Sequence, residues 1–306
     1  MSPLDLGGLA PDTKVLVAPV HLAGPGTREA VFSVLDNAAG WTKTVAFETD
    51  TYYTSPCQRV RIANPVESAY GGWTFTYAED PLGVPDWMAT FDRNTPCEII
   101  VAFTETLVES LPNHFRDYFS GGKHHTGLGQ EDVLRQSNWE SVHGSRPYWI
   151  VSPDSRAALR TRSGWLDEYT ELLTPEKSMW RLSGGVDPVH VPTWRAFFSS
   201  STPQHLRTAA ATALTSADAV PRFAGDIPER HHDLVNVRLA EPMAAVPRAQ
   251  AALARRPSTQ PRPGPRPQPH PHHLPRTVVH AVSADGPPLT PGDPACPHTR
   301  STATST

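Results

Sequence analysis

The sequence predicts an α+β fold of two tandem units, each a small antiparallel β-meander followed by a helix, with a disordered C-terminal tail. One observation is an internal repeat, and a second is that strand-forming segments precede a helix start in each copy. A third is that 17 of the 33 prolines lie in the last 86 residues, whereas 24 of the 25 aromatic residues precede residue 221. The chain is therefore not one uniform globular body.

The repeat is clearest at an offset of 107 residues. The segment Asp-Pro-Leu-Gly-Val-Pro-Asp-Trp at 80–87 returns at 187–194 as Asp-Pro-Val-His-Val-Pro-Thr-Trp. Twelve of the 35 positions from 73 to 107 are identical to their counterparts, where unrelated sequence would give about two. Further upstream Ser55-Pro56 matches Ser152-Pro153 at an offset of 97. The second copy therefore holds about ten extra residues, expected to lengthen a hairpin around 163–177.

The first unit is expected at residues 14–112. Residues 46–54, 58–63 and 72–77 are rich in β-branched and aromatic residues between turn formers, which is typical of strands. The helix is predicted to begin with Thr95 as N-cap, Pro96 at the first position and Glu98 closing a capping box. It buries apolar residues at helical spacing and ends at Pro112.

The second unit is expected at residues 137–222, after a linker at 113–136. Its strands are predicted at 147–151, 157–161 and 179–182, and its helix begins at Thr202-Pro203. The linker contains the glycine-rich stretch 120–129 with adjacent His124 and His125. Adjacent side chains diverge and no third ligand is nearby, so no metal site is predicted there.

The tail is expected to span residues 223–306 and to be disordered. Proline occupies nearly every second position from 257 to 275, which prevents helix and sheet from propagating and favours local polyproline II. This part of the chain is either a ligand for a proline-binding module or a spacer, or it is an extension without function. In either case deletion of residues 224–306 is expected to leave the melting transition almost unchanged.

Charge and composition exclude several classes. Residues 1–220 hold 17 basic and 25 acidic residues, whereas the remainder holds 10 and 6. An acidic globular part argues against sequence-independent binding of nucleic acid. The chain shows no apolar run of membrane-spanning length and no secretory signal. Its three cysteines form no C-x-x-C pair, so a reducing, cytoplasmic setting is expected, without cofactor or metal.

Five residues are candidates for a binding site, and none is assigned a catalytic role. Asp154 and Arg156 lie in a Ser-Pro-Asp-x-Arg turn that is either a ligand-binding or catalytic turn or, as we favour, a structural one. Arg59 is the counterpart of Arg156 in the first unit. Trp87 and Trp194 are candidates for stacking on bases or sugars, with burial in the core as the favoured alternative. No nucleophile, base and acid occur at a spacing that indicates catalysis.

The order of these motifs resembles the SPDY domain family, a domain of unknown function (DUF317). Ser-Pro-Asp-x-Arg is followed by a tryptophan, then by Pro-x-Trp-x-Ala-x-Phe, then by Thr-Pro and a helix, over roughly 41–111 and 139–217. The first unit departs from the pattern, because Cys57 stands where the second unit has Asp154. The resemblance implies an actinobacterial protein with two copies and carries no known activity.

The leading hypothesis for function is a non-enzymatic intracellular binding or adaptor module with an unknown protein partner. Two degenerate copies without a shared reactive set motivate it. One alternative is a nucleic-acid-associated protein of a mobile-element or regulatory system, motivated by the paired aromatic residues and by Arg59 and Arg156. Another is an enzyme whose site forms between the two units, where sequence spacing gives no signal.

Overall fold

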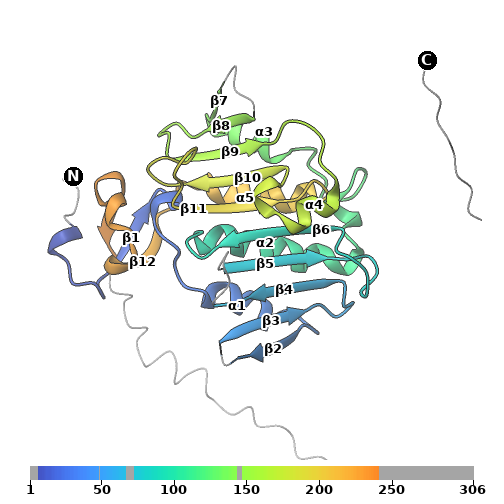
Figure 1. Ribbon diagram of the computed structural model, residues 1–306. Coiled ribbons are helices and arrows are strands. Elements are labelled where there is room, and N and C mark those ends of the chain that lie inside the picture. Colours follow the sequence, from blue (N-terminus) through green and yellow to red (C-terminus); the bar gives the residue numbers. More distant parts are fainter. Residues whose placement is uncertain (1–5, 48, 67–71, 143–146, 241–306) are drawn as a thin grey trace, which may run out of the picture. The chain divides into compact units, whose positions relative to one another are not determined.

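The computed structural model describes residues 6–47, 49–66, 72–142 and 147–240 (Figure 1). The helices are α1 (Glu29–Asp36), α2 (Cys97–Ser110), α3 (Gln130–Gln136), α4 (Glu168–Leu173) and α5 (Gln204–Leu214), with 3₁₀ turns η1 (Leu6–Gly8), η2 (Val20–Leu22), η3 (Leu111–Asn113), η4 (Arg116–Tyr118), η5 (Pro175–Lys177), η6 (Ala224–Asp226) and η7 (Glu229–Leu234). The strands are β1 (Lys14–Ala18), β2 (Thr42–Ala46), β3 (Asp50–Thr54), β4 (Val60–Asn64), β5 (Gly72–Tyr77), β6 (Trp87–Asp92), β7 (Glu140–Val142), β8 (Tyr148–Val151), β9 (Ala157–Thr161), β10 (Trp180–Gly184), β11 (Trp194–Phe198), β12 (Val220–Phe223) and β13 (Asn236–Leu239). The predicted α+β class is confirmed.

The two repeats form one ten-stranded antiparallel sheet. Its strand order is β2-β3-β4-β5-β6-β11-β10-β9-β8-β7, so the second repeat mirrors the order of the first (Figure 1). At the centre Ala89 pairs with Phe198 and Phe91 pairs with Ala196. Ala196 and Phe198 are the repeat counterparts of Ala89 and Phe91. The register is therefore symmetric about a pseudo-twofold axis at the β6–β11 junction.

The central strands β6 and β11 were not predicted. Trp87 and Trp194, for which burial in the core was the favoured interpretation, each begin one of these strands. The pattern Trp-x-Ala-x-Phe has a period of two, so Trp87, Ala89 and Phe91 all point into the core. The predicted meander therefore lacked the strand that joins it to the other repeat.

Helices cover one face of the sheet and close the main core. α1 packs on α2, α3 packs on α5, and α2 lies against α5 across the pseudo-twofold axis. Between this layer and the sheet, Phe103 of α2 contacts the rings of Phe75, Phe91 and Phe198 at centroid distances of 5.1–6.0 Å. The helices that precede each meander were missed: α1 precedes the first, and α3 lies inside the segment 113–136 that was expected to be a linker.

The predicted capping box of α2 does not form. The N-cap is Pro96 and no side chain caps the helix. The Thr95 hydroxyl instead contacts Asp92 and the carbonyl of Arg195 on β11. Glu98, expected to reach back to the N-cap, forms a bidentate ion pair with Arg222 at 2.7 Å. Contacts with the rest of the fold therefore outweigh the local cap.

A second sheet of three strands joins the two ends of the described chain. Its order is β12-β1-β13, and its own apolar core includes Val17, Ile227 and Val235. Residues 223–240, which were expected to begin the tail, pack onto the N-terminal strand, so deletion of residues 224–306 would remove part of this core. Burial of Ile227, Val235 and His231 outweighs the weak local periodicity of this segment. The predicted disorder of residues 241–306 concerns residues outside the described part.

The extra residues of the second repeat form α4 and η5 instead of a longer hairpin. Asp167 caps α4, accepting a hydrogen bond from the backbone N–H of Thr170 at 2.9 Å. On β9, Leu159 points into the core under the helices, while Arg160 points to the other face and donates to the carbonyls of Glu176 and Ser178. The insertion therefore lies on the sheet face opposite α2 and α5.

Candidate functional site

The Ser-Pro turn has the same geometry in both repeats. The Ser152 hydroxyl accepts the N–H groups of Arg156 and Ala157 at 3.1 and 2.8 Å, and Ser155 has φ of 59°. In the first repeat the Ser55 hydroxyl accepts the N–H of Val60 at 3.0 Å, and Gln58 has φ of 60°. The shared hydrogen bonds fix a tight hairpin turn with a left-handed residue, which is a structural task.

Asp154 connects this turn to the N-terminal segment. Its carboxylate contacts His21 Nε2 at 2.8 Å, accepts the Arg156 N–H at 3.0 Å and receives the Ser152 hydroxyl. Partial burial acts to raise the pKa of Asp154, but the contacts with His21 and Ser152 outweigh it and hold that pKa well below its ordinary value. Asp154 is therefore an ionised hydrogen-bond acceptor at neutral pH.

The arginine candidates lie apart. The Arg156 side chain donates to the carbonyl of Val186, and only its backbone N–H contacts Asp154 among the hydrogen bonds of the described residues. Arg59 belongs to the first repeat, and it contacts Glu79 at 3.1 Å and His114 Nδ1 at 2.7 Å. The pseudo-twofold arrangement separates the two arginines, so they do not form one basic site.

The tryptophan candidates are core residues. Trp87 is 3 % exposed and stacks on Tyr77 at 5.8 Å with an angle of 7° between the rings. Trp194 is 1 % exposed and donates its indole N–H to the His21 carbonyl at 2.9 Å. Both rings therefore lie in the core and are not free to stack on a ligand. His21 contacts both Trp194 and Asp154, whereas Arg59 and Trp87 belong to the first repeat.

A groove of about 750 Å³ lies between α2 and α5, and we call it the interhelical groove. Both repeats and the connection between them supply its walls, which are lined by Ala102, Glu105, Thr106, Tyr118, Phe119, Ser120, His124, His125, Thr126, Gly127, Leu128, Gln204, His205, Thr208, Ala209, Thr212, Ala213 and Ser216. Large, mostly apolar grooves with a few converging polar groups are the usual ligand sites of proteins. The interhelical groove is therefore the candidate site.

An aromatic wall borders the groove. Tyr118 stacks on His205 with ring centroids 4.5 Å apart, and the ring of His124 lies 5.2 Å from that of Tyr118. Burial lowers the pKa of His205 to about 4, with the charge of Arg207 acting in the same direction. The His205 imidazole is therefore neutral at pH 7.

The nearest serine to His205 is not arranged for catalysis. His205 Nε2 lies 3.2 Å from the Ser110 hydroxyl, which donates its own proton to the Thr106 carbonyl at 2.6 Å. The imidazole must then donate to Ser110, which is the reverse of general-base activation. Ser110 is also only 1 % exposed. This pair therefore supports the packing of α2 on α5 and offers no nucleophile to the groove.

Sequence reasoning noted several groove residues without assembling them. His124 and His125 were assigned to a linker, and His205 was one of several dispersed histidines. The groove draws on residues from 102 to 216, so no local motif describes it. Within the described ranges, no group of three or more histidine, cysteine or acidic side chains has the geometry to hold a metal ion.

A search for membrane spans found none among the helices of the described residues. A family model described as SPDY, domain of unknown function (DUF317), matches residues 54–112 and 151–220. These stretches run from the end of β3 through α2, and from the end of β8 through α5, so the resemblance seen in the sequence is confirmed for corresponding parts of both repeats. Neither the curated proteins nor the solved structures gave a match.

Proposed function

We propose that this protein is a non-enzymatic binding or adaptor module of the cytoplasm and that its ligand occupies the interhelical groove. We also infer that the two matched stretches are tandem copies of one domain, of the kind found in actinobacterial proteins. The observation that carries the proposal is the position of the groove: α2 of the first repeat, α5 of the second and the connecting segment all line it. A binding site at this junction explains why two repeats are held in one chain.

The lining selects the chemistry of the ligand. Small residues from both helices (Ala102, Ala209 and Ala213) leave an apolar floor. Glu105 is the one carboxylate among the lining residues, and the neutral His205 and Tyr118 form the wall. Apolar and neutral polar groups favour an uncharged ligand with an aromatic or aliphatic part, either a small molecule or a side chain of a protein partner.

The test fills the groove. Full-length protein is screened by ligand-observed NMR against uncharged aromatic and aliphatic compounds, and the hits are titrated into Ala209→Phe. The control is Val45→Phe, which places the same side chain at an exposed position of edge strand β2. We expect Ala209→Phe to lose binding by more than about tenfold, equivalent to about 1.4 kcal/mol, and Val45→Phe to retain it. No hits, or hits indifferent to Ala209→Phe, would overturn the proposal.

An enzyme with a site between the units is a second candidate, because the groove lies at that junction. The hydrogen-bond direction at Ser110 and the low pKa of His205 speak against base catalysis there. A hydrolase and transferase screen of the full chain decides the point. Turnover that His205→Ala or Asp154→Ala abolishes would replace the binding proposal with an enzyme.

Stacking of tryptophans on bases no longer supports an association with nucleic acid, because Trp87 and Trp194 are buried. The remaining support for this association is the pair Arg59 and Arg156, which lie in different repeats. A salt-titrated assay with DNA and RNA tests it. Binding at low salt that Arg59→Gln and Arg156→Gln weaken would support this alternative, and no binding at low salt eliminates it.

A further inference from the structure

The insertion between β9 and β10 has an inverted distribution of side chains. Glu171, in the middle of α4, is fully buried. Trp165, Tyr169 and Leu173 are 88, 60 and 64 % exposed. An ordinary surface helix buries its apolar side and exposes its charges. Because this segment does the opposite, its outer side has the composition of an interface without the partner.

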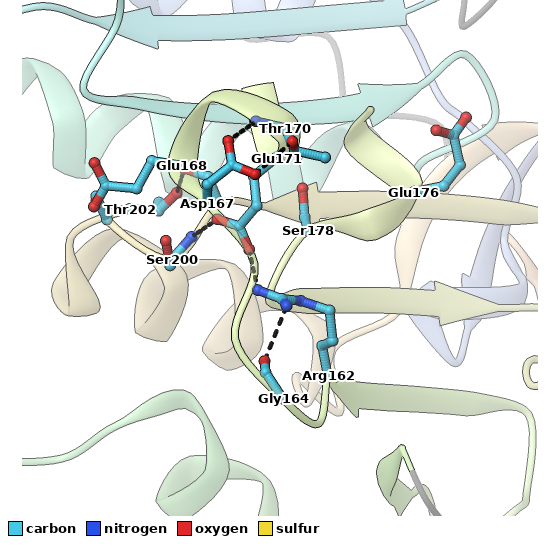
Figure 2. A network of polar contacts seen from close by, with 12 residues as sticks. Arg162, Gly164, Asp167, Glu168, Thr170, Glu171, Glu176, Ser178, Ser200 and Thr202 are labelled. Carbon is cyan, nitrogen blue, oxygen red and sulfur yellow. Dashed lines mark hydrogen bonds and ion pairs between the residues drawn. The ribbon is translucent and has the colours of Figure 1, made fainter. Parts of the chain in front are cut away.

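Polar contacts hold the insertion on the sheet (Figure 2). The Glu171 carboxylate accepts Arg162 Nη2 at 2.7 Å and the backbone N–H of Ser200 at 2.6 Å. Arg162 also donates to the Gly164 carbonyl, 2.9 Å away. Arg160 donates to two carbonyls of the segment that follows α4, both at 3.0 Å. The inner side of the insertion is thus tied to β9 and to the start of α5.

The first repeat is an internal control for these anchors. Arg160 pairs with Arg181 across β9 and β10, as Ala63 pairs with Thr74 across β4 and β5. At the position of Arg162 the first repeat has Pro65, and it lacks the insertion. The sheet therefore forms without these arginines. Their presence in the second repeat goes with the insertion that they hold.

The polar contacts of the insertion fix its position on the sheet more than they stabilise the fold. A buried ion pair is often no more stabilising than apolar residues of the same volume. A helix of six residues, the length of α4, does not persist alone in water. The contacts of Glu171 therefore fix a short segment that would not be ordered by itself, and they fix it with the aromatic side outward.

We propose that Trp165, Tyr169 and Leu173 form a docking surface for a proline-rich peptide that carries arginines. The three residues are spaced by four, which places Tyr169 and Leu173 on one side of α4. Proline rings in a polyproline II helix pack on exposed Trp and Tyr rings. The carboxylates of Glu168 and Glu176, in the same insertion, are also exposed and match arginines of the ligand. None of these residues lines the interhelical groove, so this surface does not depend on the proposed function.

Charge separates this ligand from other occupants. The two glutamates repel anionic lipid and nucleic acid, and they favour a basic partner. A suitable probe is a fluorescein-labelled synthetic peptide with the sequence of residues 260–269, Gln-Pro-Arg-Pro-Gly-Pro-Arg-Pro-Gln-Pro. A second peptide with glutamine in place of both arginines tests the charge match.

The experiment is an anisotropy titration of the full chain with each peptide. We expect saturable binding that Trp165→Ala with Tyr169→Ala weakens by about tenfold or more, as removal of aromatic anchors does. The control is Val45→Ala with Phe47→Ala, which removes exposed apolar groups from the edge of the sheet and leaves binding unchanged. The glutamine peptide is expected to bind several-fold more weakly, with less dependence on salt.

Three results would overturn the proposal. The first is no saturable binding up to about 1 mM peptide, and the second is equal binding by the Trp165 and Tyr169 variant. The third is a dimer in sedimentation that the same variant dissociates, which would assign the surface to a second copy of the chain. Both substituted side chains are exposed, so an unchanged melting transition shows that any loss of binding is local.

Discussion

Replacement of Trp194 by alanine tests whether the repeated tryptophans hold the core. Trp194 is 1 % exposed, and truncation of such a side chain costs about 3–5 kcal/mol in unfolding free energy. Its indole N–H also satisfies the His21 carbonyl at 2.9 Å, and loss of that donor adds about 1 kcal/mol. Trp194→Phe keeps most of the ring and loses the hydrogen bond, so about 1–2 kcal/mol is expected.

Denaturant unfolding of the full chain, followed by circular dichroism, measures these changes. The matched control is Trp165→Ala, because Trp165 is 88 % exposed and its removal is expected to stay within about 0.5 kcal/mol. A third variant is Gly184→Ala, whose Cβ would lie 2.6 Å from the Trp194 indole nitrogen and cost about 1–3 kcal/mol by overpacking. The reasoning fails if Trp194→Ala and Trp165→Ala have the same effect, since the burial of Trp194 would then carry no energy.

Three further changes have defined outcomes. Burial raises the pKa of Asp92 to about 6, so ionisation of this carboxyl opposes folding by at most about 3 kcal/mol. The free energy of unfolding is therefore expected to rise as the pH falls from 6 towards 4. A difference in unfolding free energy between the protein and Asp92→Asn that stays constant from pH 4 to 7 contradicts this. Glu171→Ala leaves the half-buried Arg162 without its carboxylate partner and is expected to cost about 3–5 kcal/mol in denaturant unfolding, whereas a joint change of both to leucine recovers most of it. Equal losses would show that the ion pair itself is not the cause. Asp154→Asn weakens the contact with His21 and is expected to cost about 1 kcal/mol in unfolding free energy near pH 7. Because the pKa of Asp154 is lowered in the folded state, its carboxylate stabilises the fold above the unfolded pKa near 4 and loses this effect in acid. A destabilisation by Asp154→Asn that grows on acidification would refute this pH dependence.

The repeat made much of the fold predictable. Identical spacing of Trp, Ala, Phe and Thr-Pro in both copies shows that they share one topology, and the helices at 97–110 and 204–214 follow from local start signals and apolar spacing. The central strands were open to the same logic, because Trp87, Ala89 and Phe91 alternate with a period of two. The expected strands of the first unit ended at residue 77, so this period was not used.

Other features have no local signal. β1 pairs with β12 and β13, so Val17 lies opposite Val220 and Val237, more than 200 residues away in sequence. The pairing of strands so far apart in sequence depends on burial in the complete fold. It therefore leaves no pattern in a short stretch of sequence. The interhelical groove is similar, since Ala102 and Ala209 approach each other only after the two repeats share one sheet.

The difference between the two Ser-Pro turns has a physical cause in the structure. Both turns need the serine, because Ser55 and Ser152 each accept a backbone N–H that closes the hairpin. In the second turn the residue at the third position has a partner outside the turn, because Asp154 accepts from His21 at 2.8 Å. At the same place in the first turn Cys57 is exposed and contacts only Ser55 among the hydrogen bonds of the described residues. The aspartate therefore serves the attachment of the N-terminal segment, and the serine serves the turn itself. Where the two repeats of one sheet differ in a residue, that residue serves a contact outside the sheet. By this criterion Arg160 and Arg162 serve to anchor α4.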